Sequence, residues 1–296
     1  MGGEKLGTST SSSGPGPGVS LDPPWLDAVG GGGTGGEGTE QGEGGQRARG
    51  DGPPASNDLP DAGPGTVPST QLAPARRFGA ARRNVSSFAR SGDTSALGRG
   101  IGHYSRTGMG GARQAANRMR ASTRAGAGLI SFLQQVGTAS TAEVRRWVQD
   151  LLATTPSADA VVDAIVEAVM PAGGSVDEES IRNSMANALS DLMALTPGCD
   201  PLHMSADDTW ALMQLYLSQE VCNRLRFDMG QSFESAKLTP AVVVQRELEM
   251  RQFVRNEVGV QLANLRTTTP DPSQRQLEGL MREALRLTFH VYEGLV

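Results

Sequence analysis

The sequence predicts an all-α protein in which a C-terminal bundle of about six or seven helices follows a long disordered Gly/Pro/Ser-rich tail and an arginine-rich belt. Three observations lead to this fold class. Beyond residue 126, apolar residues recur at the three- and four-residue spacing of buried helix faces, and no stretch alternates with period two. The first 75 residues contain 20 Gly and 10 Pro, which leaves little apolar surface to offset the entropy of ordering. The net charge of the segments also changes sign along the chain, from an acidic tail to a basic belt and then to an acidic C-terminal part.

Composition divides the chain into four expected segments. Residues 1–26 are predicted to be a disordered tip with a docking motif, and residues 27–75 a Gly/Pro-rich acidic linker, with 9 acids and 3 bases over the two segments together. Residues 76–125, which we call the belt, are expected to be basic and partly helical, with eleven Arg, no Lys and one acid. Residues 126–296 are expected to form the helical domain, with 22 acids and 13 bases.

Capping and proline signals place the first helices of that domain. Ser140 with Glu143 predicts a capping box that opens the first helix, and Pro156 ends it. Ser157 is positioned to cap the second helix. A third helix is expected from about 177 to 195, because its acidic first turn suits the positive end of a helix dipole.

The same signals place the later helices. Ser205, with Asp208 three residues on, is expected to open a fourth helix that ends near Phe227. Thr239-Pro240 and Asp271-Pro272 each put a capping side chain before a proline at the first helical position, and therefore predict the starts of a fifth and a sixth helix. About 170 residues are enough for one hydrophobic core.

Composition also excludes several classes of protein. The first thirty residues lack the continuous apolar region of a secretory signal, and no apolar run is long enough to cross a membrane. Two cysteines are too few for a disulfide framework, so we expect a soluble cytoplasmic protein with reduced thiols.

No catalytic residue, metal site or cofactor is expected. The glycines at 98–102 lack the full dinucleotide-binding spacing and do not follow a strand, which favours a flexible or tightly packed hinge. Cys199 and His203 form a lone pair with no second pair at ligand spacing.

The belt is the first candidate interaction region. Its guanidinium groups would present bidentate donors to phosphate or carboxylate. The partner could be nucleic acid, an acidic protein, or the acidic helical domain of the same chain. The expected contact residues are Arg76, Arg77, Arg82, Arg83, Arg90, Arg99, Arg106 and Arg113, within a basic segment that extends to residue 124.

The tip is the second candidate region. Trp25 and Leu26 are its only large hydrophobic pair, and an aromatic anchor in a disordered tail is typical of a short docking motif, although a chance Trp in a linker is the alternative. The expected docking residues are Thr8, Ser9, Pro23, Pro24, Trp25 and Leu26.

Four strings in the sequence carry a resemblance to a known family. They are Gly-Thr-Ser-Thr-Ser at 7–11, Pro-Pro-Trp-Leu at 23–26, the Arg-Arg-Phe to Arg-Ser-Gly stretch at 76–92, and the Leu-Gly-Arg-Gly to Gly-Ala-Arg stretch at 97–113. With the acidic helical half that follows, the chain resembles the QatB family of bacterial Qat anti-phage defence systems.

The resemblance implies a non-enzymatic protein encoded with three partners. These are an ATPase (QatA), a QueC-like enzyme (QatC) and a TatD-like nuclease (QatD). It further implies that the chain is the substrate of QatC, which would join a deazaguanine group to an N-terminal glycine amine.

The expected modification site is Gly7, with Gly2 as the alternative. Proteins that resemble this one are expected to begin Met-Gly-Thr-Ser, whereas here the matching glycine follows Met1 and five further residues. Either translation starts nearer Gly7, or a leader is removed first. Gly2 would instead become terminal after ordinary removal of Met1.

Overall fold

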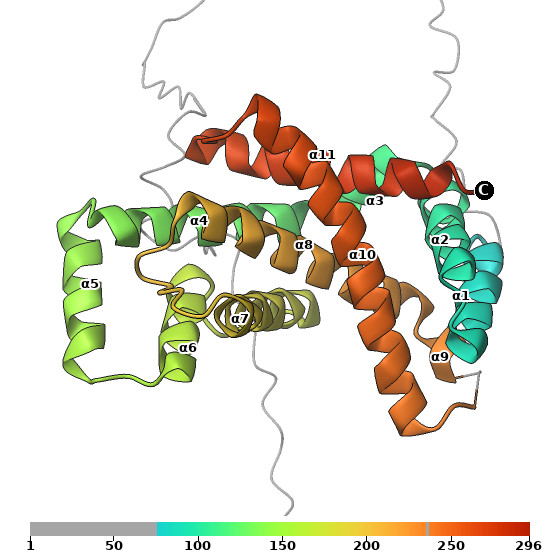
Figure 1. Ribbon diagram of the computed structural model, residues 1–296, viewed down its shortest axis with the longest axis horizontal. Helices are drawn as coiled ribbons and strands as arrows, with labels where there is room; N and C mark the ends of the chain where they lie inside the picture. Colours follow the sequence, from blue (N-terminus) through green and yellow to red (C-terminus); the bar gives the residue numbers. More distant parts are fainter. Residues whose placement is uncertain (1–75, 235–236) are drawn as a thin grey trace, which may run out of the picture. The chain divides into compact units, whose positions relative to one another are not determined.

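A computed structural model describes residues 76–234 and 237–296. The predicted tip (1–26) and linker (27–75) lie outside these described residues. Clustering of contacts assigns the chain from Ala75 to Val296 to one unit. Its described part is helical with no strand, which confirms the all-α prediction (Figure 1). The elements are α1 (Gly79–Ser91), α2 (Thr94–His103), the π-helix η1 (Tyr104–Met109), α3 (Ala112–Arg118), α4 (Arg120–Thr138), α5 (Ala142–Ala153), α6 (Ala158–Val169), α7 (Val176–Leu195), α8 (Ala206–Met229), α9 (Gln231–Glu234), α10 (Pro240–Thr268) and α11 (Gln274–Glu293).

Two of the predicted N-caps are confirmed. The Ser157 hydroxyl accepts a hydrogen bond from the backbone N–H of Ala160 at 3.2 Å, at the start of α6. Ser205 and Asp208 form the predicted capping box of α8. Helix α7 also opens with a capping box, at Ser175. Each cap satisfies backbone donors that the first helical turn leaves free.

The predicted capping box of the first domain helix is wrong by one residue. Thr141, and not Ser140, caps α5, with its hydroxyl accepting from the backbone N–H of Val144 at 3.2 Å. Ser140 serves the preceding helix: its backbone N–H donates to the carbonyl of Gln135 at 3.1 Å. That bond closes the C-terminal end of α4, where Ala139 takes the left-handed conformation.

The two proline-based helix starts have different outcomes. Helix α10 begins at Pro240 as predicted, but the side chain of Thr239 makes no capping hydrogen bond. Helix α11 begins two residues later than Asp271-Pro272 predicts, because Ser273 forms a capping box with Gln276. Oε1 of Gln276 accepts hydrogen bonds from both the backbone N–H and the hydroxyl of Ser273, which fixes the start there.

The core lies where α8 meets α4, α7 and α10, and α11 packs against α2, α3 and α4 (Figure 1). Tyr216 of α8 is buried at this centre, and its hydroxyl donates to the backbone carbonyl of Ser122 at 2.7 Å. Gly126 of α4 permits the close approach, since a Cβ there would lie 2.8 Å from Cδ1 of Tyr216.

The belt is part of this packing. Helix α1 packs on α2, and α2 packs on α11. The glycines of α2 line these contacts: a Cβ on Gly100 would lie 2.8 Å from Cγ2 of Val85 in α1. A Cβ on Gly102 would lie 3.0 Å from the carbonyl carbon of Tyr292 in α11, and closer still to its oxygen. The cluster at 98–102 therefore serves close helix packing within a continuous helix.

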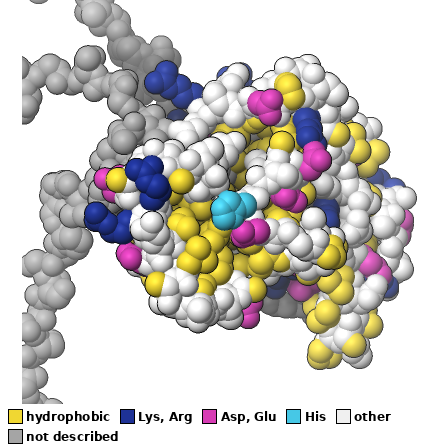
Figure 2. Space-filling model, turned by 60° about the vertical axis from the view of Figure 1, so that its left-hand side comes forward, with side chains coloured by type: hydrophobic (Ala, Val, Ile, Leu, Met, Phe, Trp, Pro, Cys, Tyr) yellow, Lys and Arg dark blue, Asp and Glu magenta, His cyan; other side chains and the backbone are white. Residues whose placement is uncertain are grey.

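Helix α5 lies at the edge of the unit and has no buried residue. Its main aromatic contact is edge-on, between Trp147 and Phe132 of α4, with ring centroids 5.0 Å apart. Figure 2 turns the α5 side of the molecule forward and shows hydrophobic side chains gathered across the middle of that face. Among the described helices, none has a stretch long and apolar enough to span a bilayer.

Candidate interaction surface

All eleven belt arginines are exposed. Helix α1 shows how the sequence achieves this. Its apolar residues Val85 and Phe88 are buried toward the rest of the unit, whereas Arg82, Arg83 and Arg90 are exposed. The helical period of the apolar residues thus turns the guanidinium groups outward.

The acidic helical domain leaves most of this positive charge unpaired. Arg99 lies 3.8 Å from Asp93, and Arg120 lies 3.6 Å from Glu278. Within the part of the chain that the structure describes, the other nine belt arginines have no Asp or Glu carboxylate within the 4.0 Å of an ion pair. The belt meets the rest of the unit through its apolar side, and its charge remains on the surface.

Several of the predicted contact residues make local contacts. The guanidinium groups of Arg77 and Arg82 lie 4.7 and 5.9 Å from the centroid of the Phe78 ring, so one aromatic ring brings these two together. Arg82 also donates to the backbone carbonyl of Asp228 at 3.2 Å, and Arg106 to that of Val296 at 2.6 Å.

The remaining predicted contact residues, Arg76, Arg83, Arg90, Arg99 and Arg113, are also exposed. The predicted modification and docking residues all lie outside the described residues: Gly2, Gly7, Thr8, Ser9, Pro23, Pro24, Trp25 and Leu26.

A partly buried polar cluster that joins the belt to α8 was not anticipated from the sequence. The Tyr104 hydroxyl donates to Oδ2 of Asp228 at 2.8 Å, and Nε of Arg224 donates to the same oxygen at 3.0 Å. Burial, followed by the charge of Asp228, raises the pKa of Tyr104 well above its ordinary value. The four-residue spacing of Arg224 and Asp228 is a helix-pair signal in the sequence, but nothing in it indicates Tyr104 as their partner.

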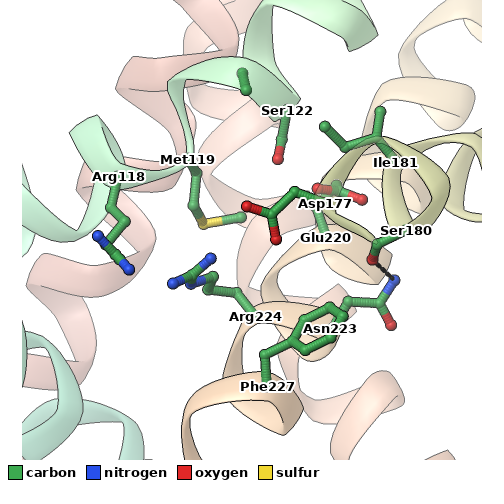
Figure 3. A pocket seen from close by; sticks show the side chains of 11 residues that line it. Arg118, Met119, Ser122, Asp177, Ser180, Ile181, Glu220, Asn223, Arg224 and Phe227 are labelled. Carbon is green, nitrogen blue, oxygen red and sulfur yellow. Dashed lines mark hydrogen bonds between the residues drawn. The ribbon is translucent and has the colours of Figure 1, made fainter. Parts of the chain in front are cut away.

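A small cleft of about 60 Å³ lies beside this cluster, between the α3–α4 junction, α7 and α8 (Figure 3). Glu220 lines it and is only 5% exposed. Burial raises the pKa of its carboxyl group, and the nearby hydroxyls of Ser122 and Ser184 counter this rise only in part. One signal could have found Glu220: it follows the buried Tyr216 and Leu217 at helical spacing, where an apolar residue is expected.

Comparison with protein families identifies the chain. The family described as Qat anti-phage system associated protein QatB matches residues 110–292. The chain belongs to the QatB family. The match extends from Gly110, two residues before α3, into α11, so the core and the cleft of this QatB family protein lie within it, whereas α1, α2 and η1 precede it. No curated protein and no solved structure matches the chain.

Proposed function

We propose that this QatB family protein is a non-enzymatic component of a bacterial Qat anti-phage system, where it acts both as a protein substrate and as an adaptor. The substrate role is modification of an N-terminal glycine by the QueC-like QatC. The adaptor role places the helical unit against other Qat components. The observation that carries the adaptor role is the set of eleven exposed belt arginines on a packed helical unit, nine of which have no Asp or Glu partner among the described residues.

The chemistry of an N-terminal glycine suits a modification substrate. An α-amino group has a pKa of about 7.7–8.0, so part of it is unprotonated and nucleophilic near neutral pH. Glycine has no side chain to obstruct the approach of a reagent. The sequence resemblance at Gly7 and Thr8 supports this role for the tip, with Gly2 as the alternative terminus.

Mass spectrometry tests the substrate role. The protein is co-expressed with QatA, QatC and QatD, and its N-terminal peptide is compared with that from cells lacking QatC. An added mass on a peptide that begins at Gly7 or Gly2, dependent on QatC, is the expected result. An unmodified, genetically encoded terminus in the presence of all partners would reject the substrate role.

Charge neutralisation tests the adaptor role. A variant with Arg77, Arg82 and Arg83 changed to Gln should lose co-purification with Qat partners, because the contact is expected to use guanidinium–carboxylate or guanidinium–phosphate pairs. A matched control changes to Gln the residues Arg145, Arg146 and Arg275, which are exposed but lie outside the belt. Equal loss in both variants would indicate a general charge effect and contradict the assignment.

The same exposed arginines support a second candidate, a nucleic-acid-binding function. Phosphate contacts would make the binding constant fall steeply as the salt concentration rises. On duplex DNA, a plot of the logarithm of the binding constant against the logarithm of the salt concentration has a slope of about −0.9 for each neutralised phosphate. The triple variant should then flatten that slope, whereas the control variant should not. Retention of the unmodified protein on DNA and RNA that shows no salt dependence would exclude this candidate.

A further inference from the structure

The cleft beside α8 contains a carboxyl oxygen that is buried away from water and accepts no hydrogen bond from the protein. Oε1 of Glu220 is buried and makes no hydrogen bond. Figure 3 shows this carboxyl group directed into the space between Met119, Ser122 and Arg224. An unpartnered buried acceptor is costly, and a cleft that leads to it offers a place for a ligand that donates hydrogen bonds.

The charges around the cleft favour a cation as that ligand. Arg224 is already paired with Asp228, since its Nε and Nη2 atoms lie 3.0 and 3.3 Å from the carboxylate oxygens of that residue. Asp177, at the mouth of the cleft, is exposed and forms no ion pair among the described residues. Its charge acts in the same direction as burial, raising the pKa of Glu220. Two carboxyl groups therefore line the space, and the charge of Arg224 offsets only part of the rise in the pKa of Glu220 that burial causes.

The remaining walls select among cations. Met119, Ile181 and Phe227 supply apolar surface, and the Phe227 side chain is 55% exposed at the rim. An alkyl chain would cover this surface, whereas a hydrated metal ion would not. Arg118 and Arg224 also line the cleft and would repel a doubly charged ion more strongly than a singly charged one.

We propose that this cleft binds a primary alkylammonium group, with the ammonium donating to Glu220 and Asp177 and the alkyl chain lying against Met119 and Phe227. Such a group is carried by a lysine side chain of a partner protein and by free polyamines. The site adjoins the arginine surface at Arg118, and the proposal does not depend on the modification of the N-terminus.

Ligand binding should also be coupled to a proton. The ionisable groups that face Glu220 are Arg118 at the end of α3, Asp177 on α7 and Arg224 on α8, while the α4 residues in the lining are uncharged. Because burial favours the neutral acid, a bound ammonium group must stabilise the carboxylate, and binding should tighten as the pH rises through the raised pKa of Glu220.

Calorimetric titration of the full chain tests the proposal. The probes are n-butylammonium chloride, Nα-acetyl-lysine amide and spermidine, with sodium chloride as the ionic-strength control. Saturable binding of n-butylammonium is expected. Tighter binding of the lysine derivative would indicate a partner side chain as the natural source, and tighter binding of spermidine a free polyamine; either supports the shared chemistry.

Three variants make the test specific. Glu220→Gln keeps the shape of the side chain and should weaken n-butylammonium binding by about ten- to a hundredfold, because a charged acceptor is lost. Asp177→Asn, at the exposed mouth, should weaken it by about two- to fivefold and does not disturb the core. Glu283→Gln replaces a half-buried acid on α11 that is paired with Arg286 outside the cleft, and it should leave n-butylammonium binding unchanged.

Two results would overturn the proposal. One is that n-butylammonium shows no saturable binding to the unmodified chain, or binds Glu220→Gln equally well while the circular dichroism spectrum is unchanged. Either outcome would leave water as the partner of Oε1. The other is binding that first appears in an Arg118→Ala variant, which would mean that Arg118 itself neutralises Glu220 in solution.

Discussion

Replacing Gly102 by alanine tests the closest helix contact in the unit. The added methyl group would lie 3.0 Å from the carbonyl carbon of Tyr292 and closer still to its oxygen. These are backbone atoms, so no side-chain rotation relieves the overlap. Helix α2 must instead move away from α11, and the hydrogen bond between Ser105 and Glu293, 2.6 Å long, lies directly beside this contact.

The expected cost follows from two opposing effects. Overpacking a buried contact costs about 1–3 kcal/mol, and a backbone overlap belongs at the upper end of that range. Alanine recovers about 1 kcal/mol relative to glycine inside a helix. The net loss for Gly102→Ala is therefore about 2 kcal/mol, which lowers the melting temperature of a unit of this size by about 4–8 °C.

Gly279→Ala is the matched control. Gly279 lies within α11, is exposed, and has nothing within 4 Å of the position of an added Cβ. The same substitution should therefore stabilise the protein by about 0.4–1 kcal/mol. Thermal and urea denaturation of the full chain measure both variants. A Gly102→Ala protein as stable as the Gly279→Ala protein would refute the close contact between α2 and α11.

Three further predictions concern polar groups. Glu220→Gln should stabilise the protein at pH 7. The pKa of the buried Glu220 carboxyl is raised in the folded state, so the wild type loses stability as the pH rises from the pKa of the unfolded state, about 4.3, through the pKa of the folded state. Urea denaturation should show this gain disappear below about pH 4, and a gain independent of pH would contradict the assignment. Tyr104→Phe should lower stability by about 1–3 kcal/mol, because the bond to the carboxylate of Asp228 is lost; an unchanged urea midpoint would argue against that bond. Thr141→Ala should speed hydrogen exchange in the first turn of α5, consistent with the loss of a cap of about 1 kcal/mol, whereas Ser140→Ala should not.

Helix starts were predictable where one capping signal acted alone. Ser157 and Ser205 had no competing signal, and both begin helices as the sequence indicates. The prediction was wrong where two signals lay close together. Ser140 and Thr141 are adjacent, and only the three-dimensional end of α4 decides which one caps α5. Similarly, the capping box at Ser273 prevailed over the proline at 272.

The candidate surface was only partly predictable. Composition located the arginines of the belt, but their exposure depends on which side of α1 and α2 packs inward, and that is a tertiary property. The polar cluster joins Tyr104 to Asp228 across 124 residues, and no local pattern connects positions so far apart. Glu220 was visible as a charged residue at apolar spacing, although the cleft in front of it was not.

The packing of α2 against α11 has a consequence for the order in which the unit assembles during synthesis. The belt leaves the ribosome early, yet the partners of Gly102, Ser105 and Arg106 are Tyr292, Glu293 and Val296. Until α11 has been translated, the side of α2 that packs against α11 has nothing to cover it. Contacts between residues so distant in sequence form slowly, and a nascent chain with this exposed face is open to capture by chaperones in the interval.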